Sequence, residues 1–165
     1  MGILNKIQAA EALLSANKAL FLSDPHLTSL LFRLESAITA SHKAMVMAGI
    51  VEICRRCDEE RGGSCCGDGM ERHYDQWLIL TNLLLGVDIS HDRQDPRACF
   101  FLGRKGCILR ARHTICINYL CSDITKSVDP DLVSQLKIRE GEELSLLFHT
   151  IEHLKRIVRE RGGQV

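Results

Sequence analysis

The cysteine-rich part of the chain begins with CRRCDEERGGSCCGD at residues 54–68 and ends with CFFLGRKGCILRARHTICINYLC at residues 99–121. It contains all eight cysteines of the protein, whereas residues 1–53 and 122–165 contain none. Cysteines that served only as small apolar side chains would not leave both flanks empty. The distribution therefore predicts a metal-binding segment that is carried by helical flanks.

The thiols of all eight cysteines are the candidate metal ligands: Cys54, Cys57, Cys65, Cys66, Cys99, Cys107, Cys116 and Cys121. Thiolates are soft ligands that suit zinc, copper(I) and iron–sulfur clusters. Because a structural zinc site and most iron–sulfur clusters take four ligands, eight cysteines suffice for two centres, or for one centre with spectators. We expect one or two iron–sulfur clusters, with Zn²⁺ as the alternative.

The spacing of the cysteines leaves their grouping open. Cys54 and Cys57 are three residues apart on a predicted helix, so both thiols lie on one face. Cys65 and Cys66 are adjacent and their side chains tend to diverge, so they could serve two different centres, or one of them could be idle. The gaps between the later cysteines match neither a bacterial ferredoxin nor a zinc finger or zinc ribbon.

The residues around the cysteines also form a recognisable order, which is Cys54-Arg-Arg-Cys57, Cys65-Cys66, Cys99-Phe-Phe-Leu102, Gly106-Cys107-Ile108 and Cys116-(four residues)-Cys121. This order resembles the YkgJ-type cysteine-cluster family over residues 54–121, and not over the flanks. The chain departs from the family in a longer gap before its double cysteine and in His113, where the family tends to have proline. The resemblance implies a domain that chelates zinc or iron, and it implies no particular reaction.

Three histidines are additional candidate ligands. His113 lies inside the cysteine-rich part, where it could replace a cysteine or donate a hydrogen bond to sulfur. His149 and His153 are four residues apart on one face of a predicted helix, a spacing compatible with one metal ion. Helical periodicity by itself also explains the positions of this second pair. Asp68 and Glu71, near the cysteines, are more simply explained as surface charges than as acid–base groups.

Hydrophobic periodicity predicts a mainly α-helical protein with a single domain over residues 1–165. We expect helices at about 3–20, 25–57, 70–85 and 130–162, and cysteine-rich segments at 54–69 and 97–121. The expected architecture is a four- to five-helix bundle with an irregular cysteine-rich metal-binding cap, in which residues 99–109 form a short hairpin or a knuckle.

Particular residues mark the expected ends of these helices. Asp24-Pro25 and Asp129-Pro130 each combine an N-cap residue with a proline that suits the first helical position. Gly86 is a suitable C-terminal stop. Gly141 is a place where the last helix could bend or divide.

Composition narrows the functional classes. Lys plus Arg and Asp plus Glu both number 21, so the formal net charge is zero and gives no general attraction to nucleic acid or to anionic membranes. No apolar run reaches the ~18 residues of a membrane span, and the N-terminus lacks the pattern of a secretion signal. We therefore expect a cytoplasmic protein with no nucleic-acid or membrane partner, in a compartment where reduced thiols favour metal binding over disulfides.

The sequence thus predicts a cysteine-ligated metalloprotein, with iron–sulfur preferred to zinc, that acts in electron transfer or metal handling with an unknown protein or redox partner. One alternative is a helical protein-interaction module with structural zinc. Another is a metalloenzyme of unknown substrate. Because the chain has no catalytic-triad motif, phosphate-binding loop or dinucleotide fingerprint, its catalytic residues, if it is an enzyme, are unknown.

Overall fold

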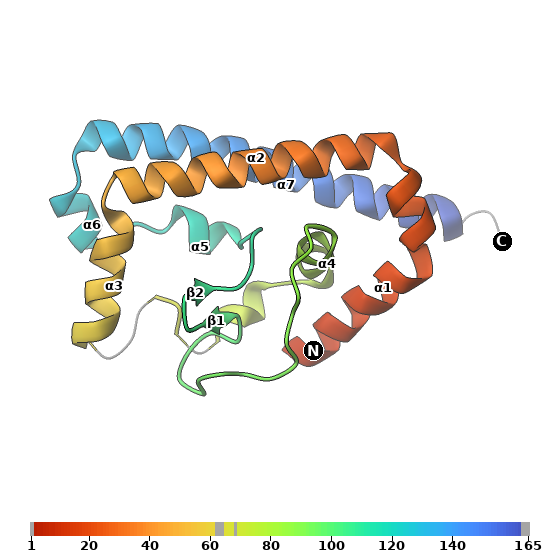
Figure 1. Ribbon diagram of the computed structural model, residues 1–165, viewed down its shortest axis with the longest axis horizontal. Helices are drawn as coiled ribbons and strands as arrows, with labels where there is room; N and C mark the ends of the chain where they lie inside the picture. Colours follow the sequence, from red (N-terminus) through yellow and green to blue (C-terminus); the bar gives the residue numbers. More distant parts are fainter. Residues whose placement is uncertain (1, 62–64, 68, 163–165) are drawn as a thin grey trace.

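The computed structural model describes residues 2–61, 65–67 and 69–162, and within them the protein is mainly helical, as its hydrophobic pattern predicts. Three long helices form the frame: α1 (Ile3–Ser23), α2 (Pro25–Met47) and α7 (Pro130–Gly162). Helices α2 and α7 run side by side in opposite directions, and α1 leaves α2 at a sharp corner (Figure 1). This arrangement is consistent with a helical bundle.

Shorter elements lie between α2 and α7 in the sequence. They are α3 (Ile50–Arg61), the 3₁₀ helix η1 (Met70–His73), α4 (Gln76–Leu84), β1 (Leu102–Gly103), β2 (Gly106–Cys107), α5 (Thr114–Asn118) and α6 (Ser122–Ser127). Helices α3 and α6 contact each other at one end of the long helices (Figure 1). The strands and α5 lie between that end and α4.

The predicted single helix over 25–57 is wrong, because the chain bends between α2 and α3. The two helices meet at an angle of 70°. At the bend Gly49 adopts a φ of 73°, a left-handed conformation that glycine reaches without a steric penalty. The amide of Gly49 donates to the carbonyl of Val46 at 2.9 Å, which closes the last turn of α2. As a result α3, which carries two of the cysteines, points away from α2 instead of extending it.

Three of the other predicted helix boundaries are confirmed, and one of them is the start of α7 at Pro130. Asp24 accepts a hydrogen bond from the amide of Leu27 at 2.7 Å, as an N-cap residue does. Gly86 follows α4 with a φ of 79°. The predicted helix over 70–85 divides into η1 and α4, because the side chain of Asp75 accepts hydrogen bonds from two amides and begins a new helix. Gly141 does not interrupt α7.

The hairpin, which was one of two alternatives for residues 99–109, is present. Strands β1 and β2 are antiparallel, and Leu102 pairs with Cys107 while Gly103 pairs with Gly106. Gly106 adopts a φ of 106°, so the tight connection needs a residue without a Cβ. The hairpin brings the backbone of Cys107 back beside the residues that follow Cys99.

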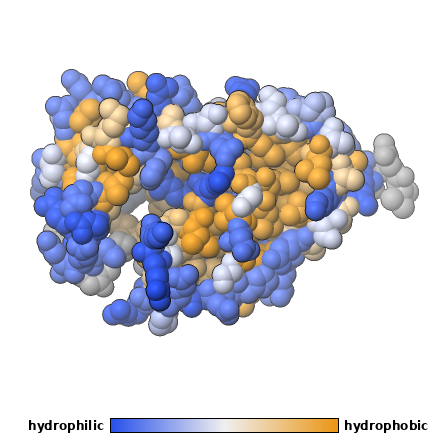
Figure 2. All heavy atoms as spheres, viewed as in Figure 1, coloured by the Kyte–Doolittle hydropathy of each residue, from blue (hydrophilic) through white to orange (hydrophobic). Residues whose placement is uncertain are grey.

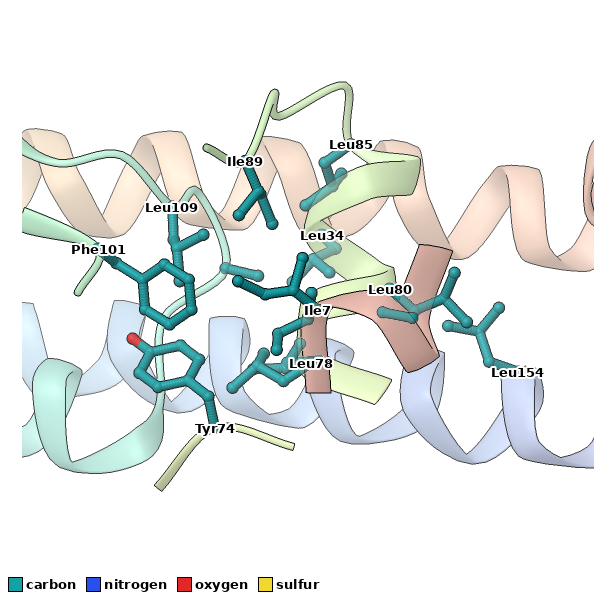
Figure 3. Close-up of a cluster of buried hydrophobic side chains, with 14 of the residues drawn as sticks. Ile7, Leu34, Tyr74, Leu78, Leu80, Leu85, Ile89, Phe101, Leu109 and Leu154 are labelled. Carbon is teal, nitrogen blue, oxygen red and sulfur yellow. The ribbon is translucent and has the colours of Figure 1, made fainter. Parts of the chain in front are cut away.

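The main hydrophobic core joins the helices to the second cysteine-bearing segment. Its buried residues come from α1, α2, α4 and α7, and from the segment itself, which contributes Cys99, Phe100, Phe101, Leu109 and Ala111. Figure 3 shows the ring of Phe101 beside that of Tyr74, and their centroids are 4.9 Å apart. Because buried apolar surface is the main stabilising contribution to a fold, this segment is held by the helical core.

A smaller core lies where α3 and α6 meet the long helices. It consists of Ala48, Ile50, Ile124, Val128 and Leu136. At the end that carries α3, hydrophilic residues surround a few apolar ones, whereas apolar residues gather over a larger area in the middle of the same face (Figure 2).

Asn82 connects α4 to the second cysteine-bearing segment. The residue is fully buried, and its amide nitrogen donates to the carbonyls of Leu78 and Ala111 at 2.9 and 2.8 Å. Its side-chain oxygen accepts from the amides of Arg110 and Ala111 at 2.9 and 3.0 Å. The side chain therefore uses all of its hydrogen-bonding capacity, and three of the four bonds fix the segment to the helix.

Glu71 connects the two cysteine-bearing segments, and its interpretation as a surface charge is wrong because only 5% of the residue is exposed. Its carboxylate accepts hydrogen bonds from the amides of Gly69 at 3.1 Å and Phe100 at 3.3 Å, and it pairs with Arg93. Burial would raise the pKa of Glu71, but hydrogen bonds from backbone amides and from Arg93 outweigh burial and lower it. Asp68, the other acidic residue considered, lies outside the described residues.

None of the described helices is by itself both long and apolar enough to cross a membrane, whereas the bent pair of α2 and α3 together passes that test of length and composition.

The bend at Gly49 predicts opposite effects for two glycine substitutions. Gly49→Ala is expected to lower the free energy of unfolding by about 1 kcal/mol, because an L-residue is strained in the left-handed conformation. Gly141→Ala is expected to raise it by about 0.5–1 kcal/mol, because Gly141 is inside α7 and a Cβ there would meet no atom within 4 Å. Urea unfolding followed by circular dichroism measures both. Changes of the same sign would contradict the assignment of the bend.

The hydrogen bonds of Asn82 predict a larger effect. Asn82→Ala is expected to cost about 2–4 kcal/mol of unfolding free energy, because it leaves two buried backbone groups of Ala111 without their partner. The exposed Asn118 offers a matched control, and Asn118→Ala should change the urea midpoint little. Equal midpoints for the two variants would show that Asn82 does not fix the segment.

Candidate metal centre

A first group of thiols gathers where α3 meets α6. Cys54 and Cys57 lie one turn apart on α3, and Cys121 directly precedes α6. The side chains of Cys54 and Cys121 pack against the same small core. Burial raises the pKa of Cys54, and the negative charges of nearby thiolates, including Cys57, Cys65 and Cys121, raise it further. These four cysteines therefore form one neighbourhood.

Cys65 belongs to this first group because its thiol interacts electrostatically with the thiols of Cys121 and Cys57. Burial raises the pKa of the Cys65 thiol, and the charges of Cys121 and Cys57 add to the increase. Cys65 is exposed, whereas the other three members of the group are partly buried. The group therefore opens towards solvent on the side of Cys65.

A second group of thiols gathers around the hairpin. The amide of Cys99 donates to the carbonyl of Cys66 at 2.7 Å, so the two cysteine-bearing segments are joined directly through their backbones. The amide of Leu102 donates to the carbonyl of Cys99 at 2.9 Å, and Leu102 pairs with Cys107 across the hairpin. With Cys116, which Tyr74 attaches to this group, the members are Cys66, Cys99, Cys107 and Cys116.

Tyr74 donates a hydrogen bond to sulfur in this second group. Its hydroxyl lies 3.6 Å from the Sγ of Cys116 and accepts a hydrogen bond from the amide of His113 at 3.1 Å. Burial raises the pKa of Tyr74, and the charges of Cys116 and Cys107 raise it further, although the amide of His113 acts in the opposite direction. The phenol therefore keeps its proton at neutral pH and remains a donor to the sulfur.

The electrostatic environment of Cys99 and Cys107 in the second group favours protonated thiols in the absence of a cation. Burial raises the pKa of Cys99 to about 11, with contributions from the charges of Glu71, Cys107 and Cys66. The pKa of Cys107 also rises to about 11, because protein atoms surround its thiol even though the residue has exposed surface. Cys66 and Cys116 add to that increase, and the positive charge of Arg112 opposes it.

The two groups adjoin at the Cys65–Cys66 pair. Cys65 interacts with Cys57 and Cys121 of the first group, while Cys66 raises the pKa of both Cys99 and Cys107 in the second. Cys66 also contributes to the raised pKa of Cys54, so the groups are neighbours and not separate sites at a distance.

All eight cysteines carry free thiols. Within residues 2–61, 65–67 and 69–162, no three His, Cys, Asp or Glu side chains are arranged so that they would hold one metal ion. The sulfurs of each group thus lie near one another without converging on a common point. Because rotation about χ1 moves a cysteine sulfur while the backbone stays in place, the donors have a way to tighten around an ion. The assignment of the cysteines as ligands stays a prediction.

His113 lies beside the second group and caps α5. Its Nδ1 accepts a hydrogen bond from the amide of Ile115 at 3.2 Å, and its ring lies 5.4 Å from that of His73. Burial lowers the pKa of His113, and the charge of His73 lowers it further, against the opposing effect of Asp75. The imidazole is therefore neutral at pH 7, with one nitrogen engaged in capping.

His149 and His153 lie far along α7, near the corner between α1 and α2. His153 is buried, and its Nε2 lies 3.0 Å from the carboxylate of Asp24 while its Nδ1 lies 2.9 Å from Arg156. These contacts explain His153 as part of the packing at the start of α2. His149 is exposed in a groove between α2 and α7. The structure brings neither histidine together with the cysteine groups, and their role as ligands stays a prediction.

Three supporting residues were not identified as functional from the sequence. Glu71 joins the cysteine-bearing segments, Asn82 holds the second segment on α4, and Tyr74 donates to a sulfur. The sequence contained one indication for Tyr74, which is an aromatic residue shortly before the apolar run 77–80 and has a polar hydroxyl that needs a partner when buried. Nothing in their spacing indicated that Glu71 would bind Phe100 or that Asn82 would bind Ala111, because these partners are backbone groups 29 residues away.

Comparisons with models of protein families, with curated proteins and with solved structures found no match for this chain.

Proposed function

We propose that this protein is a cysteine-ligated metalloprotein, with iron–sulfur clusters as the preferred cofactor, that acts in electron transfer or metal handling. The observation that carries the proposal is the gathering of eight thiols, from two segments remote in sequence, into two adjoining groups. On this proposal, the cysteine-rich segments are a metal-binding cap over one end of the helical bundle.

The electrostatics of the thiols support this function. Thiolates that lie close together repel one another. For this reason the charges of neighbouring thiolates raise the pKa values of Cys54 and Cys99. A soft cation at the centre of such a group would replace the protons and convert repulsion into attraction, since the thiolate is the form that binds metal. Thiols with raised pKa values, such as those of Cys99 and Cys107, are poor nucleophiles, whereas the same thiols around a metal ion would be ligands.

The surroundings of the second group support a redox role. Hydrogen bonds to sulfur and nearby charges determine the reduction potential of an iron–sulfur cluster, which when bound would supply one-electron transfer. Tyr74 donates to the sulfur of Cys116, and the positive charge of Arg112 acts on Cys107. These residues would stabilise the thiolate form and adjust the potential without binding the metal themselves.

The resemblance of residues 54–121 to the YkgJ-type family adds support, because it implies chelation of zinc or iron. A cytoplasmic location is part of the same proposal, since thiols remain reduced and available to metals there. An unknown redox partner would accept or deliver the electron.

A groove between α2 and α7 favours a second candidate function, a protein-interaction module with structural zinc. The groove has a volume of about 1120 Å³, and its lining combines apolar and charged side chains, including Leu30, Phe32, Arg33 and Glu152. Phe32 is 71% exposed, which is high for a large apolar side chain. In this function the metal would stabilise the fold, and the groove would bind a partner protein.

The preferred function predicts a coloured protein. Purified without oxygen, the full chain is expected to be brown, with absorbance at roughly 400 nm and with bound iron and sulfide. Elemental analysis and a visible spectrum measure this. A colourless protein with stoichiometric zinc would reject the iron–sulfur function in favour of the interaction module.

A pair of variants distinguishes ligand cysteines from other candidate residues. Cys54→Ser/Cys99→Ser should lose most of the bound metal, because one donor is removed from each thiol group. His149→Ala, which changes an exposed groove residue, should keep the metal content of the wild type. Full metal content in the double cysteine variant would contradict the proposed centre.

A further inference from the structure

The adjacent cysteines 65 and 66 divide the thiols of this protein into two sets. Cys65 interacts with thiols of α3 and of the start of α6, whereas the backbone of Cys66 is bonded to that of Cys99 beside the hairpin. Both residues lie in a bend of the chain, and because the side chains of adjacent residues tend to diverge, the two cysteines are suited to serve two different centres. The sequence left this grouping open.

We propose that the eight cysteines form two closed four-thiolate metal centres of fixed membership. Cys54, Cys57, Cys65 and Cys121 hold the first centre, and Cys66, Cys99, Cys107 and Cys116 hold the second. This inference rests on the proposed function and deepens it, because it assigns each ligand to a metal.

Packing supports the membership of the first centre. Cys54 and Cys57 are at positions i and i+3 of α3, so their thiols lie on one face of the helix. Cys54 and Cys121 both pack against the small core of Ala48, Ile50, Ile124, Val128 and Leu136. That core holds α3 against α6, so the two helices would present their thiols to the same ion.

Backbone pairing supports the membership of the second centre. The hydrogen bond between Cys99 and Cys66 and the hairpin that returns Cys107 place three cysteines around one turn of chain. The ring of Tyr74 packs against Phe101 next to β1, and its hydroxyl donates to the sulfur of Cys116, which places Cys116 on the same side of the fold. Cys66, Cys99 and Cys116 also pack against the main core, not the small one.

For the five cysteines that pack against one of the two cores, the division between the cores agrees with the electrostatic interactions. Four thiolates complete the tetrahedral shell of a zinc ion and the usual ligand set of an iron–sulfur cluster, so neither centre needs a ligand from elsewhere. Because Cys66 also acts on Cys54, the centres are adjacent, as two clusters that exchange an electron would be.

Three double variants of the full chain test the membership. Zinc ion is added to the reduced, metal-free proteins, bound zinc is counted by elemental analysis, and cysteines that resist alkylation are identified by mass spectrometry. The wild type is expected to bind about two zinc ions. Cys54→Ser/Cys57→Ser should bind about one and protect only the four thiols of the second centre. Cys99→Ser/Cys107→Ser should bind about one and protect only the first.

A mixed variant is the matched control, since it removes the same number of thiols. Cys57→Ser/Cys107→Ser leaves three thiolates in each centre and should weaken zinc binding and protection at both. Circular dichroism of every metal-free variant checks that the helices remain.

Each other outcome has a distinct meaning. A wild type that binds no metal would reject the proposed function together with this inference. A wild type that binds metal while a variant protects thiols from both sets would overturn only the membership. One ion that protects all eight thiols would also overturn it.

Discussion

The buried carboxylate of Glu71 holds the two cysteine-bearing segments together. It accepts from an amide beside the double cysteine and from an amide beside Cys99, and it is charge-balanced by Arg93. A buried carboxylate without these partners would be costly, so the interaction requires both segments to be in place. The direct hydrogen bond between the backbones of Cys66 and Cys99 depends on the same alignment. The contact between Cys66 and Cys99 in the second thiol group therefore depends on this buried carboxylate.

The helices position the thiols in two different ways. The bend at Gly49 turns α3 out of line with α2, which directs Cys54 and Cys57 towards α6. The second segment instead lies on the bundle, where Phe101 and Ala111 are fully buried and Asn82 binds the backbone. The bend at Gly49 and the buried contacts of the second segment both fix the backbone, and neither of them uses a cysteine sulfur. They explain how a chain whose eight cysteines carry free thiols brings these residues into two neighbouring groups.

Much of the helical frame could be predicted, because its causes are local. Asp24 caps the N-terminus of α2, and Gly86 follows the end of α4. Hydrophobic periodicity locates α1 and α7. The division of the 25–57 helix was missed because Gly49 lies within a continuous apolar pattern, and periodicity alone does not reveal a left-handed residue. The hairpin was foreseen only as an alternative, since two strands are marginal without the packing that tertiary structure supplies.

The sequence by itself determined that soft donors are concentrated in one part of the chain and that helices flank them, because composition and periodicity are properties of neighbouring residues. Only the tertiary structure decided which thiols lie together, that Glu71 is buried, and that His153 belongs to the packing of α2. These outcomes depend on contacts between residues that are far apart along the chain, such as Glu71 with Phe100 and Tyr74 with Cys116. Spacing carries no information about such contacts, since their geometry arises only when the core has formed.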